Sequence, residues 1–178
     1  METFWPEFQK VSNLEFNGIV AVDTKFLTNL LEVLGPIGVS GWGNFSAEPD
    51  SRCEGCPQVV YELEKLITKP LNRIVRERKA VIGPLMHSIL ANAMGSPKEK
   101  LPALFEAALS SAQEKHVIFY FPDQNIQAAV ESFNIAGRIK PFEGDYFHLN
   151  DANFAGAKVN IFLRQEVEQK IEVSRDGT

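Results

Sequence analysis

The sequence predicts an α/β domain of three layers, in which helices cover both faces of a mixed sheet. Short apolar runs alternate along the chain with longer segments whose apolar residues recur every three or four positions. The apolar fraction of 44% is ordinary for a globular protein. A chain of 178 residues can bury one real core, so we expect a single domain over residues 1–178.

The first third of the chain predicts a strand, a helix and a second strand. Residues 16–23 form a nearly continuous apolar run, which is typical of a buried strand. Asp23 or Thr24 can cap the next helix, because either side chain can accept a first-turn N–H. A leucine-rich stripe predicts that helix, which should end at Gly35 and the proline after it. A short strand is expected over Ile37–Val39.

The middle of the chain predicts a long loop and two helices. Glycine, serine, proline and asparagine dominate residues 40–56, which we expect to be irregular. Helices are expected over residues 57–67 and 71–94. Gly83 and Pro84 should kink or split the second helix, because proline removes one backbone hydrogen bond.

The last third predicts more strands and helices. A capping-box pattern opens a helix over residues 96–112, a buried strand is expected over 116–121, and a helix follows over 123–133. Residues 145–151 and 158–173 are expected to be strands. The second of these alternates apolar and charged side chains, which indicates a strand with one solvated face. Its tail, residues 165–178, should pair in a hairpin or lead toward a further domain.

Charge and composition exclude several classes of function. A net charge of −5 argues against a nucleic-acid-binding surface. No apolar run approaches the roughly 20 residues of a membrane helix and no secretory signal is visible, so we expect the chain as given to be soluble. No phosphate loop, dinucleotide fingerprint, nucleophile elbow or zinc-protease motif is complete, and we predict no cofactor. The histidines share no ligand spacing, which predicts no metal site: His87, His116 and His148.

Two cysteines, Cys53 and Cys56, precede a predicted helix with the spacing CEGC. This spacing fits a small structural disulfide outside the cytoplasm, and it also fits two free thiols. Redox chemistry is a third interpretation, because a helix N-terminus lowers the pKa of a thiol, and metal binding is a fourth.

A helical segment presents a candidate phosphate site. Arg73 and Arg76 are three residues apart and leave one helix face, with Arg78 close by. Two guanidinium groups side by side can bind a phosphate or a pyrophosphate through paired hydrogen bonds. The alternative is a solvated helix face whose arginines pair with glutamates.

The turn DANFAGAK also permits two interpretations. Asn153 or Gly156 can adopt a positive φ in a purely structural turn. Alternatively, Asn153 and Lys158 line a cleft at the end of a strand.

Several segments resemble the bacterial domain-of-unknown-function family number 4012. The most specific are NGIVAVD and DANFAGAKVN, and the resemblance runs in order along nearly the whole chain. It implies the C-terminal part of a larger extracytoplasmic protein, anchored to the membrane by a segment outside this chain. It also implies that strands of the complete sheet are missing, and it favours a Cys53–Cys56 disulfide.

A weaker resemblance links the chain to the LytR-CpsA-Psr family, whose members transfer glycopolymers from a polyprenyl diphosphate lipid to the cell wall. The segment from Arg73 to Glu77 is similar to that family's R-x-x-R-Q helix, with glutamate in place of glutamine. This resemblance implies that Arg73, Arg76 and Arg78 bind the pyrophosphate of a lipid-linked glycan. The family's catalytic arginine and aspartate have no counterpart in this chain.

Two hypotheses therefore follow from the sequence. The first is a binding or structural module of the cell envelope, which is favoured because no acid, base or nucleophile can be named. The second is the pyrophosphate-binding part of a LytR-CpsA-Psr-like phosphotransferase, with Lys158 sharing the anion if the fold brings it near the arginines.

Overall fold

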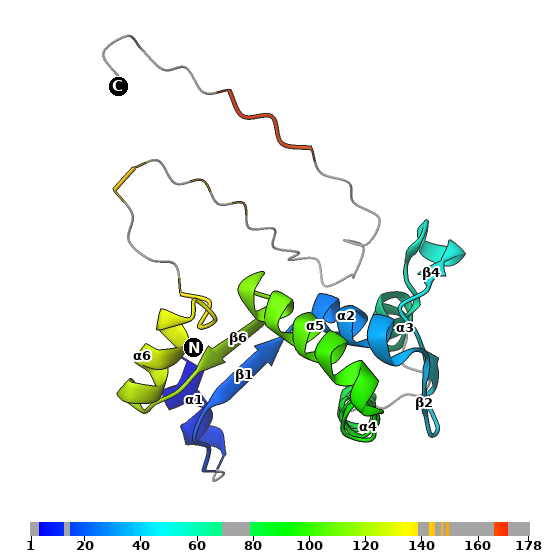
Figure 1. Cartoon of the computed structure of the whole chain (residues 1–178), viewed down its shortest axis with the longest axis horizontal. Coiled ribbons are helices and arrows are strands. Elements are labelled where there is room, and N and C mark those ends of the chain that lie inside the picture. The colour runs from blue at the N-terminus through cyan, green and yellow to red at the C-terminus, as the bar shows by residue number, and fades with distance from the viewer. Residues whose placement is uncertain are drawn as a thin grey trace.

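Figure 1 shows a computed structural model of the chain. The structure describes residues 4–12, 15–68, 79–138, 143–144, 147, 149 and 166–170.

Helices and strands alternate through the described residues, which confirms the α/β class. The helices are α1 Phe4–Val11, α2 Thr24–Leu34, α3 Gln58–Thr68, α4 Ile82–Met94, α5 Leu101–Gln113 and α6 Gln124–Ser132. The strands are β1 Ile19–Val22, β2 Ile37–Val39, β3 Gly43–Phe45, β4 Pro49–Asp50, β5 Cys56–Pro57 and β6 Val117–Tyr120. Short 3-10 turns occupy Ser51–Cys53 and Lys98–Lys100.

The arrangement of the strands differs from the predicted mixed sheet. Within the described part of the chain the strands form three separate antiparallel pairs, β1–β6, β2–β3 and β4–β5. The last two pairs are local hairpins inside or beside residues 40–56, which we had expected to be irregular. Gly41 and Gly43 adopt φ of 78° and 98°, so the chain can reverse sharply between β2 and β3.

The β1–β6 pair brings residues 19–22 beside residues 117–120, which are far apart in the sequence (Figure 1). Contrary to the predicted burial of β1, the side chains of Val20 and Val22 are 55% and 40% exposed. Both valines point to the same face of the two-stranded ribbon, because alternate residues of a strand share a face. On the other face, Tyr120 lies opposite Ile19 and its ring packs near that of Trp5 from α1.

The core lies where α2, α3, α4 and α5 meet the β2–β3 hairpin. Helix α2 runs along α5, and β2 contacts α4 (Figure 1). The buried apolar side chains come from every one of these elements: Leu27, Leu30, Leu31, Ile37, Val39, Phe45, Val59, Leu63, Val81, Leu85, Ile89 and Leu104. Burial of such side chains is the main stabilising contribution to a fold of this size.

Both ends of α2 are capped. The carboxylate of Asp23 accepts hydrogen bonds from the backbone N–H groups of Lys25 and Phe26, which confirms the predicted start of this helix. At the other end, Nζ of Lys100 donates to the carbonyl oxygens of Val33 and Leu34. The position and orientation of α2 are therefore fixed at both termini.

Helix α4 begins where the sequence predicted a break. Its first residue is Ile82, so Gly83 and Pro84 lie in its first turn. Proline is tolerated there because a first-turn nitrogen has no carbonyl partner within the helix. Residues 71–78 of the predicted longer helix lie outside the described residues.

The predicted C-terminal strands fall mostly outside the described residues. Residues 166–170 are described, exposed and not part of a strand, contrary to prediction. A strand needs a neighbour for its backbone groups, and no described segment pairs with these five residues. Among the described residues, no helix combines the length and apolar character needed to cross a membrane.

Candidate functional site

The predicted phosphate site lies outside the described residues. This holds for all five of its members: Arg73, Arg76, Arg78, Asn153 and Lys158. Lys79, the next residue after the arginine segment, is described and exposed. Pyrophosphate binding therefore stays a prediction.

The CEGC segment is described in full. Cys53 and Cys56 are joined by a disulfide that closes the turn between β4 and β5. Cys53 is buried and Cys56 is half-buried. Between them, Glu54 and Gly55 both have left-handed backbone conformations, with φ of 57° and 95°. Glycine adopts this conformation without cost, whereas glutamate seldom does.

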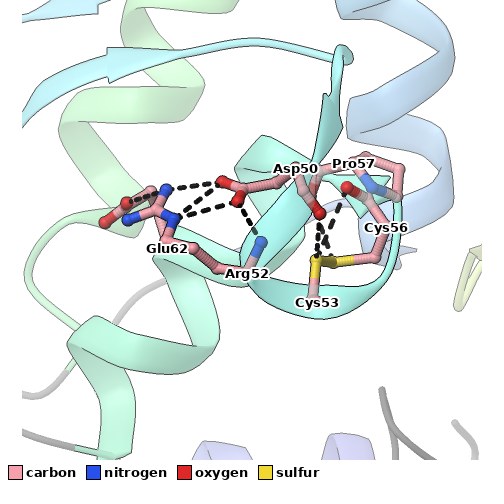
Figure 2. The surroundings of a disulfide bond; sticks show 6 residues. All are labelled: Asp50, Arg52, Cys53, Cys56, Pro57 and Glu62. Atoms are coloured by element: carbon pink, nitrogen blue, oxygen red, sulfur yellow. Dashed lines mark hydrogen bonds and ion pairs between the residues drawn. A yellow bond between two sulfur atoms is a disulfide. The ribbon is translucent and has the colours of Figure 1, made fainter.

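An ion-pair network fixes the start of the same turn (Figure 2). Nε of Arg52 lies 2.9 Å from Oδ1 of Asp50, and one of its terminal nitrogens lies 2.7 Å from Oε1 of Glu62 on α3. Asp50 also accepts a hydrogen bond from the backbone N–H of Arg52. The guanidinium group stacks on Tyr61, 4.3 Å from the ring centre. Arg52 thus links the turn to α3.

The charges in this network alter the proton affinity of both partners. Hydrogen bonds from the Arg52 side chain, followed by the one from its backbone, lower the pKa of Asp50 to about 2. The hydrogen bond to Asp50, followed by the one to Glu62, raises the pKa of Arg52 above its usual range. Asp50 and Arg52 are consequently both charged at neutral pH.

The base of the turn is held by a separate set of bonds. The backbone N–H of Gln58 donates to the carbonyl of Glu48, and that of Val59 donates to Ser46. The side chain of Gln58 accepts from the N–H of Ser46 and donates to the carbonyl of Asn44. Val59 is fully buried in the core. These bonds connect the hairpins to the start of α3 without involving the disulfide.

A second polar cluster joins the β1–β6 ribbon to α2. Nδ1 of His116 lies 2.7 Å from Oδ2 of Asp23, the carboxylate that caps α2. Nε2 of the same ring lies 3.6 Å from Glu114. The backbone N–H of Asp23 donates to the carbonyl of His116. These contacts hold the residue before β6 against the residue that caps α2.

The two described histidines, His87 and His116, lie in different parts of the fold. His87 is exposed on α4, His116 lies directly before β6, and His148 lies outside the described residues. Over the described ranges, no group of three or more His, Cys, Asp or Glu side chains is arranged to hold a metal ion.

Apolar side chains are exposed on α4 and α5. Leu90 and Met94 lie one turn apart on α4, and Leu101, Phe105 and Leu109 follow one another at four-residue intervals on α5. The most exposed are Met94 at 79% and Phe105 at 69%. Groups of exposed apolar side chains on a folded protein commonly mark contact surfaces.

Sequence patterns identified the cysteine pair but missed the ion-pair network around it. The available signal was Asp50 two residues before Arg52, since aspartate often caps a short turn through its own side chain. The partner Glu62 carried no comparable signal. Its contact with Arg52 depends on how the turn folds back over α3.

Comparisons with protein-family models, with curated proteins and with solved structures found no match for this chain. The two family resemblances inferred from sequence segments therefore stay predictions.

Proposed function

We propose that this chain is a binding or structural module of the bacterial cell envelope, working on the extracytoplasmic side of a membrane to which a segment outside this chain anchors it. The observation that carries the proposal is the Cys53–Cys56 disulfide. Disulfides persist in oxidising compartments and are uncommon in the cytosol, where thiol reductants keep cysteines reduced. The location agrees with what the resemblance to family number 4012 implies.

A binding role is supported by the exposed apolar residues of α4 and α5. Met94 and Phe105 leave most of their side-chain surface in contact with water, which costs free energy unless a partner covers them.

A structural role is supported by the number of contacts that fix the β4–β5 turn. Arg52 makes ion pairs with two carboxylates and stacks on Tyr61.

Trapping the thiols in the producing bacterium tests the location. Intact cells are quenched with acid, and free thiols are then alkylated with a maleimide that adds a measurable mass. The label is read on the tryptic peptide Cys53–Lys65, which contains both cysteines, and the reagent should add nothing to it before reduction and two groups after it. Two additions before reduction would place the chain in a reducing compartment and would contradict the proposal.

A topology reporter tests the extracytoplasmic location independently of the thiols. Alkaline phosphatase fused after the full-length parent protein is active only outside the cytoplasm, because its own disulfides must form there. We expect activity from this fusion. The matched control replaces Cys53 and Cys56 by serine, and it should leave the reporter active because location does not depend on this disulfide. An inactive reporter on both fusions would refute the extracytoplasmic location.

A further inference from the structure

Asn17 and Gly18 form the only Asn–Gly pair in the sequence, and they lie directly before the first residue of β1. The chain bends at Asn17, and this residue is exposed to solvent. Strand pairing begins one residue after Gly18, where Ile19 lies opposite Tyr120. The side-chain amide of Asn17 and the backbone nitrogen of Gly18 therefore precede the paired part of the strand.

Gly18 has no room for a side chain, because Phe121 packs against it. A Cβ atom on Gly18 would lie 2.5 Å from Cδ1 of the Phe121 ring, well inside the contact distance of two carbon atoms. Phe121 is itself held in place, since its backbone N–H donates to Oε1 of Gln127 on α6 at 2.9 Å. The fold thus requires glycine after Asn17, and glycine hinders the approach to its own backbone nitrogen least.

Two other described asparagines are placed differently. Asn29 donates a hydrogen bond to Oγ of Ser111 and precedes a leucine. Asn92 lies within α4 and donates to the carbonyl oxygen of Ser88. A side chain that is bonded in place, or that precedes a larger residue, reaches the next backbone nitrogen less readily. Asn17 combines solvent exposure, a bend in the chain and a following glycine.

We propose that Asn17 is a site of spontaneous covalent modification, which water converts to aspartate and isoaspartate, and that the isoaspartyl form loosens the start of β1. The reaction requires only water, so it does not depend on the compartment in which the chain works. Either product places a new carboxylate at the entrance to the β1–β6 ribbon.

The reaction proceeds in two steps. The backbone nitrogen of Gly18 gives up its proton and attacks Cγ of Asn17, a new N–C bond forms, and the side-chain nitrogen leaves as ammonia. Water then opens the resulting cyclic imide. Attack at Cγ gives aspartate, whereas attack at the main-chain carbonyl carbon of Asn17 gives isoaspartate. One water is consumed and one ammonia is released, with no oxidation or reduction.

The two products should affect β1 differently. Isoaspartate inserts one extra carbon atom into the main chain before Gly18, and Phe121 leaves Gly18 little room to absorb the shift. The pairing of Ile19 with Tyr120 should weaken, so the amides of β1 should exchange faster with solvent. Aspartate adds the charge but keeps the length of the main chain, and it should leave β1 paired.

Mass spectrometry of the aged chain tests the chemistry. The intact chain is incubated at mildly alkaline pH, sampled over time and digested with trypsin. The tryptic peptide of residues 11–25 carries both Asn13, which precedes leucine, and Asn17. Asn17 should lose its amide at least about tenfold faster than Asn13, and position 17 should yield both aspartyl and isoaspartyl peptides. Equal rates would overturn the proposal, and so would an Asn17 that stays intact in the folded chain while the same synthetic peptide is converted.

The matched control is Asn17→Gln, whose longer side chain must close a larger ring and should stay unconverted. Hydrogen exchange is then compared among the fresh chain, the aged chain and Asn17→Asp. The isoaspartyl form of the aged chain should exchange faster at the amides of β1, whereas Asn17→Asp should match the fresh chain and amides within α2 and α4 should not change. Equal exchange of β1 in the aged and fresh chains, or equal loosening in Asn17→Asp, would overturn the effect assigned to isoaspartate.

Discussion

Arg52 connects the β4–β5 turn to α3 through one side chain. It bonds to Asp50 within its own turn, to Glu62 on the helix, and to the face of Tyr61. The carboxylate of Asp50 belongs to a residue that is only 8% exposed, and a carboxylate in such a position is costly without a cation beside it. The stability of the turn should therefore depend on this arginine.

The variant Arg52→Ala should lower the melting temperature, because it leaves Asp50 without its main hydrogen-bond donor. Arg52→Lys should recover part of the loss, since lysine keeps the charge but cannot reproduce the forked contact. Lys65→Ala is the matched control. Lys65 lies 3.4 Å from the same Glu62 and is half exposed, and its loss should have little effect. Equal losses for Arg52→Ala and Lys65→Ala would contradict the role given to Arg52.

Asp50 should make stability depend on pH in the acid range. Its pKa is about 2 in the folded protein, below the ordinary value of 3.8, so folding favours the ionised form. The contribution is fully present above about pH 5 and is lost as the pH falls through 4 toward 2. The melting temperature of the protein minus that of Asp50→Asn should be constant above pH 5 and should shrink toward pH 2. A difference that stays constant down to pH 2 would show that Asp50 is not the titrating group.

Helices and hairpins contribute unequally to stability. The disulfide closes a ring of only four residues, so chain entropy predicts a loss of about 2 kcal/mol for the double serine variant. Leu85 of α4 is 1% exposed in the core, and Leu85→Ala should cost about 2–5 kcal/mol. Urea unfolding followed by circular dichroism measures both losses. A larger loss from the serine variant than from Leu85→Ala would mean that the turn, rather than the core, limits stability.

The elements that the sequence predicted well are those with several independent signals. Helix α2 combines a capping aspartate, a leucine stripe and Gly35 at its end, and its bounds were close to the prediction. Strands β3, β4 and β5 were missed because each has only two or three residues, too few to show an alternating pattern. The exposure of Val20 could not be predicted, since it depends on which segments cover the β1–β6 ribbon.

The candidate site was also predictable only where the signal lies within one short segment of the sequence. The spacing CEGC is visible in the sequence, and its chemistry could be narrowed to a few alternatives. The contact between Arg52 and Glu62 joins two elements, and no local pattern encodes it. The cluster of His116 with Asp23 is equally long-range, because it forms only when β1 and β6 pair.

At the scale of the whole molecule, the pyrophosphate hypothesis makes a prediction that does not need the structure of the predicted site. If Arg73 and Arg76 bind a lipid pyrophosphate, an isoprenyl pyrophosphate should raise the melting temperature of the chain. Arg76→Ala should abolish the shift, and Lys79→Ala, a nearby exposed cation, should leave most of it. The absence of any shift for the full-length protein would eliminate the hypothesis.

The β1–β6 ribbon has a consequence for the order in which the chain folds. Ile19 pairs with Tyr120, so this contact closes a loop of roughly a hundred residues, whereas the β2–β3 and β4–β5 hairpins close over a few. During synthesis, both hairpins and α3 can form while β6 is still inside the ribosome. Strand β1 must wait, with Val20 and Val22 in water and its backbone unpaired. A chain released before Val117 would lack β6, so β1 would be an unpaired, apolar strand, and aggregation of such fragments should begin at β1.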